Sequence, residues 1–151
     1  MKPILFSLIV ALLSACVTAA RPEVRITLGK PNHKIEPPGS SIPGYESIEF
    51  PVRLTNSSGK PVWIYTQLRK RPSFSLYLRD NPTAPWRDET MPGCGLGTAF
   101  HSIAPGESIL SSVWVPADRK RRQLRVEMPI YSTPDFTAKA RNAASEATPI
   151  R

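Results

Sequence analysis

The chain has few of the residues on which most enzymes and metal proteins depend. Its 151 residues include two cysteines and two histidines. His33, His101 and Cys94 match no zinc pattern, because structural zinc sites place pairs of ligands a few residues apart. There is also no phosphate-binding glycine loop and no pair of neighbouring catalytic carboxylates. We therefore expect a protein that is not an enzyme and holds no metal or cofactor.

Cys94 is the only cysteine left to explain if Cys16 is modified or removed. A nucleophilic thiol needs a base, here His101 or His33, to become a thiolate at neutral pH. The alternative is a small buried side chain that packs in the glycine-rich segment 91–97. An odd cysteine in an exported protein can also form a disulfide between chains. We expect a free or intermolecular thiol at Cys94, and no catalysis.

Long helices are not expected either, because 17 residues are proline. An interior proline removes a backbone donor and clashes with the preceding turn. Acidic residues are few: 12 face 20 lysines and arginines, which gives a formal net charge of +8. A basic protein is attracted to nucleic acid, anionic lipid and acidic polymers alike, so charge alone does not select the partner.

The chain has one long apolar run, residues 4–13, which follows Lys2 and is interrupted only by Ser7. About ten residues are too few to span a bilayer and are typical of a signal peptide. The next residues, Leu13-Ser14-Ala15-Cys16, resemble the lipobox of bacterial lipoproteins. In that motif two small residues precede a cysteine that is acylated and becomes the new N-terminus.

The lipobox resemblance implies a signal peptide over 1–15, a lipidated Cys16 and a tether over 16–22. Several acyl chains would anchor the protein firmly, with the domain facing the periplasm or the cell exterior. Residues 17–22 reach at most about 20 Å, so the domain would lie close to the membrane. The alternative is ordinary cleavage after Ala19 or Ala20, which would release a soluble periplasmic or secreted protein.

Most of the remaining chain alternates between apolar and polar residues, as a half-buried strand does. The clearest case is 48–55, which a turn at 56–59 separates from the β-rich segment 62–66. Other segments with strand character are 23–28, 74–79, 86–89, 100–103, 108–116 and 123–130. About seven short strands with turns between them predict an Ig-like antiparallel β-sandwich over 23–131.

Two segments do not show this alternation. Residues 29–44 contain four prolines and predict an irregular crossing loop. Residues 132–151 predict a disordered or weakly helical tail, because Phe136 is nearly the only large apolar side chain before Ile150.

Between Leu54 and Val126 the order of motifs resembles a group of bacterial Ig-like domains. The matching stretches are LTNSSGKPVWIYT, FSLYLRD, CGLG and IAPGES. The hairpin and the Pro-Gly-Glu turn are similar to those of the BsuPI-like intracellular proteinase-inhibitor family, whereas CGLG resembles uncharacterised exported domains. The resemblance implies an Ig-like fold. It transfers no functional residue.

Two basic runs are candidates for contact with anionic lipid headgroups or lipopolysaccharide. Each positive charge near such a surface contributes about 1 kcal/mol. The alternative is that they are solvated loops which keep sheet edges from pairing with other chains. The residues are Arg69, Lys70, Arg71, Arg119, Lys120, Arg121 and Arg122.

Together these observations predict a non-enzymatic envelope lipoprotein that binds an envelope protein or an anionic surface polymer. Nucleic acid is not expected, because the protein is exported. One alternative, by family analogy, is a protease inhibitor that inserts the segment 29–44 into a protease. Another is a soluble, secreted, basic binding protein.

Overall fold

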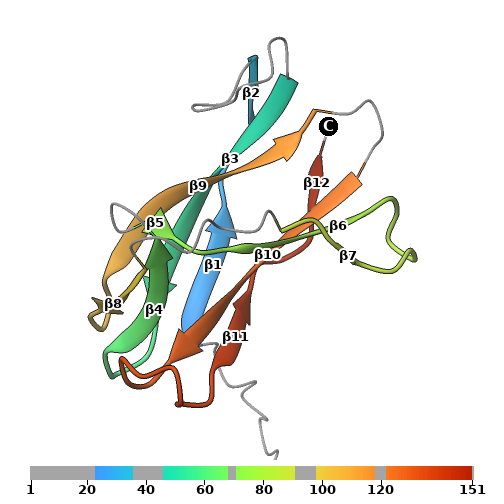
Figure 1. Ribbon diagram of the computed structural model, residues 1–151. Coiled ribbons are helices and arrows are strands. Elements are labelled where there is room, and N and C mark those ends of the chain that lie inside the picture. The colour runs from blue at the N-terminus through green and yellow to red at the C-terminus, as the bar shows by residue number, and fades with distance from the viewer. Residues whose placement is uncertain (1–22, 36–45, 68–70, 91–97, 118–121, 151) are drawn as a thin grey trace, which may run out of the picture.

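The structure is a computed structural model that describes residues 23–35, 46–67, 71–90, 98–117 and 122–150. These ranges form strands arranged in two sheets, and every paired strand runs antiparallel to its neighbour (Figure 1). The prediction of an all-β protein with an antiparallel β-sandwich is confirmed. The strands are β1 (Val24–Leu28), β2 (Asn32–Ile35), β3 (Glu46–Asn56), β4 (Val62–Gln67), β5 (Arg71–Pro72), β6 (Ser75–Arg79), β7 (Arg87–Asp88), β8 (Ala99–Ile103), β9 (Ser108–Pro116), β10 (Arg122–Tyr131), β11 (Arg141–Ala144) and β12 (Thr148–Ile150).

The smaller sheet is organised around β3, which has eleven residues. β1 and β2 pair with its C-terminal and N-terminal parts along one edge. β9 pairs with nearly the whole length of the other edge.

The larger sheet is organised around β10. β6 and β4 pair with successive parts of β10 on one side, and their registers overlap those of β12 and β11. β11 and β12 must therefore lie along the opposite side of β10. β5 and β8 extend the sheet from β4, and β7 forms its edge beyond β6. Among the described residues, no helix is long and apolar enough to cross a membrane.

The core lies between the two sheets and contains the apolar residues of the alternating pattern. Phe50 and Leu54 of β3 are completely buried, as are Ile64 of β4 and Leu124 and Val126 of β10. Their neighbours in sequence point outward, so the outer face of each sheet carries the alternate residues.

The C-terminal segment corrects one prediction. Residues 132–151 were expected to form a disordered or weakly helical tail, but β11 and β12 pair with β10 and bury Ala143 and Ile150. Ser145 continues this pairing, since its N–H donates to the Val126 carbonyl and its hydroxyl accepts from the Val126 N–H. Two small strands need few apolar residues because β10 supplies the other side of each contact.

The segment 29–44 also differs from the prediction. Four of its residues form β2, which pairs with the first residues of β3. The strand Asn-His-Lys-Ile has no apolar alternation, so its pairing is set by the backbone of β3 and not by a buried face. Residues 36–45 lie outside the described residues.

Four turns share one side-chain arrangement. In each, an Asn or Asp carboxyl or amide oxygen accepts the N–H of the residue two positions later, which is always Ser or Thr. In at least three of them the hydroxyl of that residue also donates to the first side chain. The pairs are Asn56–Ser58, Asn81–Thr83, Asp88–Thr90 and Asp135–Thr137. This is the local bonding for which such residues are favoured in turns.

The turn at Asp135 leads to a prediction about pH. The hydroxyl and the N–H of Thr137 hold the pKa of Asp135 below its ordinary value of 3.8. The folded protein therefore binds fewer protons here than the unfolded chain, so this contribution to stability is present above the ordinary pKa and is lost as the pH falls through the folded pKa. In Thr137→Val, an NMR titration should show the pKa of Asp135 raised. Thr90→Val is the matched control, because it should raise the pKa of Asp88 and leave Asp135 unchanged.

A candidate binding surface on the larger sheet

The two basic runs are only partly within the described residues. Arg71 lies in β5 and is exposed, and Arg122 begins β10. The Arg122 side chain is only 17% exposed, and its Nε lies 3.6 Å from Asp80 Oδ1. Arg122 is therefore engaged with the protein itself, and its contact with an anionic surface stays a prediction. Arg69, Lys70, Arg119, Lys120 and Arg121 lie outside the described residues.

A different cluster of arginines lies on the outer face of the larger sheet. Arg79 of β6 and Arg125 of β10 both pack on the ring of Trp86, with the guanidinium carbons 4.4 and 4.7 Å from the ring centroid. Arg125 also lies 5.4 Å from the ring of Tyr77, its cross-strand partner. Such cation–π contacts stabilise by about 0.5–1 kcal/mol each when exposed.

We call Tyr77, Arg79, Trp86 and Arg125 the Trp86 cluster. Its two arginines differ in how far their charges are paired. Arg125 forms an ion pair of 2.6 Å with Glu127, while its Nε is buried without a hydrogen-bond partner. Arg79 donates to Gln123 Oε1 at 2.7 Å. No ion pair joins Arg79 to an acidic residue in the part of the chain that the structure describes, so it is the cation here with the most capacity for an external partner.

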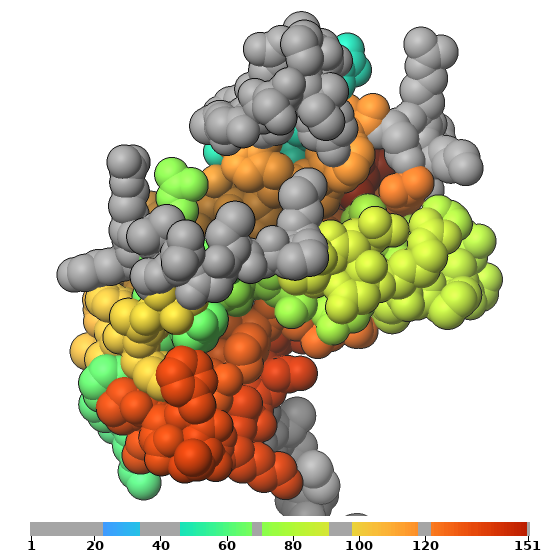
Figure 2. Space-filling model, in the orientation of Figure 1, coloured from blue at the N-terminus to red at the C-terminus, as the bar shows by residue number. Residues whose placement is uncertain are grey.

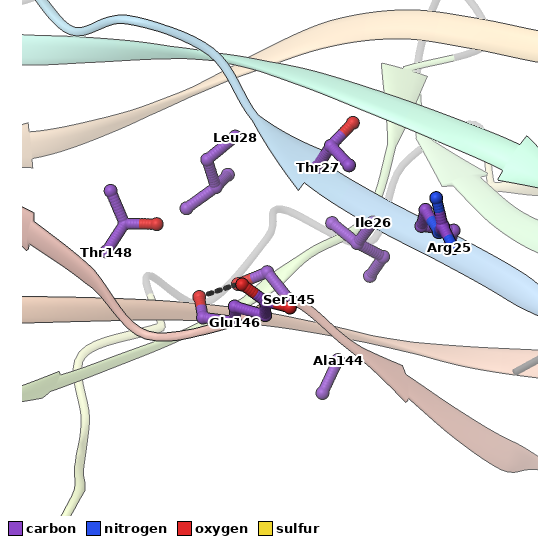
Figure 3. A pocket seen from close by; sticks show the side chains of 8 residues that line it. All are labelled: Arg25, Ile26, Thr27, Leu28, Ala144, Ser145, Glu146 and Thr148. Carbon is purple, nitrogen blue, oxygen red and sulfur yellow. Dashed lines mark hydrogen bonds between the residues drawn. The ribbon is translucent and has the colours of Figure 1, made fainter. Parts of the chain in front are cut away.

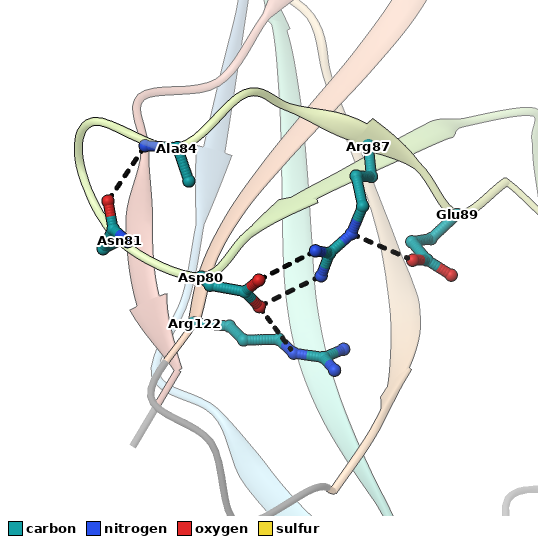
Figure 4. Close-up of polar contacts among 6 residues, drawn as sticks. All are labelled: Asp80, Asn81, Ala84, Arg87, Glu89 and Arg122. Atoms are coloured by element: carbon teal, nitrogen blue, oxygen red, sulfur yellow. Dashed lines mark hydrogen bonds and ion pairs between the residues drawn. The ribbon is translucent and has the colours of Figure 1, made fainter.

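A second group of charges holds the β6–β7 connection (Figure 4). Arg87 donates to both carboxylate oxygens of Asp80, at 2.8 and 3.0 Å, and its Nε lies 3.8 Å from Glu89. Asp80 also forms an ion pair with Arg122. The two arginines therefore balance the charges of the two carboxylates, Asp80 and Glu89. The Asn81 Oδ1 fixes the turn by accepting the Ala84 N–H. These contacts position the β6–β7 segment, which projects from the sandwich as the yellow-green lobe in Figure 2.

Aromatic side chains cover the other end of the same outer face. Tyr65 and Phe100 are cross-strand partners on β4 and β8, and Phe100 also packs edge-on against Tyr131. Phe136 folds back onto this group, 4.5 Å from the Phe100 ring and 5.5 Å from Tyr65, yet remains 65% exposed. We call Tyr65, Phe100, Tyr131 and Phe136 the aromatic cluster.

Two cavities lie among the described residues, the first away from this face and the second at its margin, beside Tyr131. One, of about 480 Å³, separates β1 from residues 144–148 and is lined by Arg25, Thr27 and Glu146 among others (Figure 3). Three hydroxyl-bearing side chains line it, those of Thr27, Ser145 and Thr148. The Ser145 hydroxyl is engaged, because it donates to the Glu146 carbonyl and accepts from the Val126 N–H. The cavity is a gap at the seam between the sheets, where Ile26 and Ser145 form a single parallel bridge.

The second cavity, of about 420 Å³, marks the end of the sandwich at which the described chain begins. Glu23, Lys60, Tyr131 and Arg141 line it, so the start of β1, the β3–β4 turn and the β10–β11 connection meet here. Arg141 forms an ion pair of 3.0 Å with Glu23. A tether from Cys16 would enter the domain at this end.

The two candidate bases for a thiol at Cys94 lie in different sheets. His33 lies in β2 of the smaller sheet and His101 in β8 of the larger sheet, and Cys94 lies outside the described residues. Within the described ranges no group of three His, Cys, Asp or Glu side chains is arranged to hold a metal ion.

The Trp86 cluster was not predicted from the sequence, although the alternation of residues in two strands contains part of the information. The alternation in β6 places Tyr77 and Arg79 on one face, and that in β10 places Arg125 and Glu127 on one face. Only the register between the two strands brings these faces together under Trp86.

Comparisons with known proteins support the fold alone. No protein family and no curated protein matches the sequence. The structure is similar to a crystal structure described as a "putative ApaA protein" from Bordetella pertussis, with a TM-score of 0.52, 13% identity, and coverage of 84% of this chain and 91% of that one. A structural-genomics X-ray structure matches with a TM-score of 0.51, 12% identity, and coverage of 85% and 84%.

Proposed function

We propose that this protein is a non-enzymatic binding module of the bacterial cell envelope, held at the membrane by an acylated Cys16. The observation that carries the binding role is the outer face of the larger sheet. It combines the aromatic cluster with the Trp86 cluster, where an ordinary exposed face would carry scattered polar residues. Aromatic residues and arginine are the side chains enriched at protein interfaces.

Phe136 and Arg79 are the two most available groups on this face. Phe136 is 65% exposed although it already contacts two rings, so a partner could bury it without displacing core residues. Arg79 is preoriented by Trp86 and Gln123, which lowers the entropy lost when it binds an acidic group. A protein surface with an apolar centre and a carboxylate would suit both.

The location rests on the sequence around Cys16. The short apolar run and the Leu-Ser-Ala-Cys motif motivate acylation. The relation to BsuPI-like domains remains a resemblance. The protease-inhibitor alternative is less favoured, because four residues of the proposed inhibitory segment are paired in β2.

One experiment tests both the membrane anchor and the binding surface. Cells expressing the chain with a photoreactive phenylalanine at position 136 are labelled with radioactive palmitate, illuminated and fractionated. We expect label on the protein, recovery in membranes, and crosslinked adducts. Cys16→Ser should lose the label and the membrane recovery.

The matched control places the photoreactive residue at Arg53, which is exposed on the outer face of the smaller sheet. Adducts at position 136 but not at 53 would support the proposed face. Equal adducts at both positions, or none at 136, would contradict it. If the chain that keeps Cys16 took up no palmitate, the proposed anchor would be wrong, and the protein would be a soluble exported one.

A further inference from the structure

β9 forms an open edge of the smaller sheet. Its nine residues pair with β3 in uninterrupted register from Ser108 to Pro116. No strand in the described parts of the chain pairs with its other edge, and the first part of β9 runs along the border of the molecule in Figure 1.

The register determines which backbone groups this edge presents. Asn56 N–H donates to the Glu107 carbonyl, and Ala117 N–H donates to the Glu46 carbonyl. Odd-numbered residues therefore bond to β3 along the whole strand, because hydrogen-bonded pairs alternate in an antiparallel ladder. The N–H and C=O groups of Leu110 and Ser112 consequently point away from β3, in the plane of the sheet.

This edge lacks the usual protection against pairing with another chain. Natural edge strands carry lysine, interior proline or a bulge. The sequence SILSSVWVP has no charged residue, its proline is the last residue, and its register has no bulge. Leu110 is moreover 71% exposed, which makes it one of two large apolar side chains so exposed among the described residues.

We propose that β9 pairs antiparallel with β9 of a second copy of this chain, with the two-fold axis at Ser112. This axis places each Leu110 opposite Trp114 of the second copy and Ile109 opposite Val115. Directly opposite side chains lie about 4.5–5.5 Å apart, close enough for Leu110 and the indole to bury each other. The two smaller sheets would become one continuous sheet.

The axis must lie on a residue and not between two residues, because only then do the outward-pointing, even-numbered residues of both copies face each other. The axis at Ser112 pairs all nine residues, whereas an axis on any other residue of the strand would pair fewer, for example only 108–112 for an axis at Leu110. Self-pairing also suits an uncharged strand, since a charged side chain near the axis would lie opposite the same charge of the second copy.

A symmetric pair of this kind is isologous and closed, so it ends at two copies. The strands of the two copies run in opposite directions, so the ends at Glu23 lie at opposite ends of the joined sheet. With both copies anchored in one membrane, the dimer would lie along the surface. The pairing itself does not depend on the anchor.

The test is a disulfide across the axis. Cys16 and Cys94 are replaced by serine, so that an introduced cysteine is the only thiol. In the purified, oxidised protein, Ser112→Cys should give a disulfide-linked dimer, because the paired Cα atoms would lie about 5.5 Å apart. Ser108→Cys, on the same strand, should not, since its two copies would be about 26 Å apart.

A second variant tests the same contact without a crosslink. Ser112→Lys places two positive charges opposite each other and should weaken association by about tenfold or more, measured by light scattering over a concentration series. Arg53→Gln, on a neighbouring strand, should leave association unchanged. Equal crosslinking at 108 and 112, or a monomer at all concentrations with a folded spectrum, would overturn the proposal.

Discussion

Deleting residues 132–151 is expected to lower the free energy of unfolding by about 4 kcal/mol or more. The deletion removes Ile150 and Ala143 from the core and leaves β10 with an unpaired edge. Burial of one large aliphatic side chain contributes about 1.5–3 kcal/mol, and the exposure of Leu124 and Met128 adds to the loss. Because domains of this size are stable by only about 5–15 kcal/mol, the deletion should remove between about a quarter and most of the stability.

Thermal and urea unfolding followed by circular dichroism would measure this effect. A matched pair of substitutions separates burial from chain length. Ala143→Asp places a charge in a buried position and should cost about 3 kcal/mol, whereas Ala144→Asp, one residue later and exposed, should cost less than about 0.5 kcal/mol. Equal effects of the two, or a truncated chain as stable as the whole, would mean that β11 and β12 do not belong to the folded domain.

Replacing Asn56 by alanine is expected to lower the free energy of unfolding by about 3 kcal/mol, and the melting temperature by about 10 °C. Asn56 has no exposed surface. Its Nδ2 donates to the carbonyls of Lys60 and Ile103, at 2.8 and 2.9 Å, and its Oδ1 accepts from Ser58. The Ile103 carbonyl is buried, so alanine would leave it without this partner at the cost of desolvation.

Asn81→Ala provides the control for this prediction. Asn81 makes the same turn with Thr83, but it is exposed and bonds only within its own loop. We expect a loss of about 0.5–1.5 kcal/mol there, because water can replace the lost bonds. If the two alanine variants unfolded at the same temperature, the link from Asn56 to β8 would contribute nothing, and the turn alone would explain its role.

The sequence was sufficient for the strands whose side chains follow the two-residue period. β1, β3, β4, β9 and β10 fall where the alternation predicts them. The Pro-Gly turn before β9 also forms as predicted, with Gly106 at a φ of +77° and the Glu107 N–H bonded to Ala104. At such positions the local preference and the tertiary fold agree.

The strands that were missed have few large apolar residues. β11 reads Arg-Asn-Ala-Ala and is held by the backbone of β10 and by a single buried methyl group at Ala143. Composition could not reveal this, because the stabilising surface belongs to a different segment. The Trp86 cluster was missed for a related reason, since Arg79 and Arg125 are 46 residues apart in sequence and meet only through strand register.

The place where the chain enters the sandwich has a mechanical consequence. β1 starts at the end where the tether would attach and runs away from it, paired with β3 at five successive positions. A pull on the tether along β1 would load all of these pairs together in shear, instead of opening them one at a time as in a zipper. A module held by its first strand in this way would resist extraction by tension on that strand.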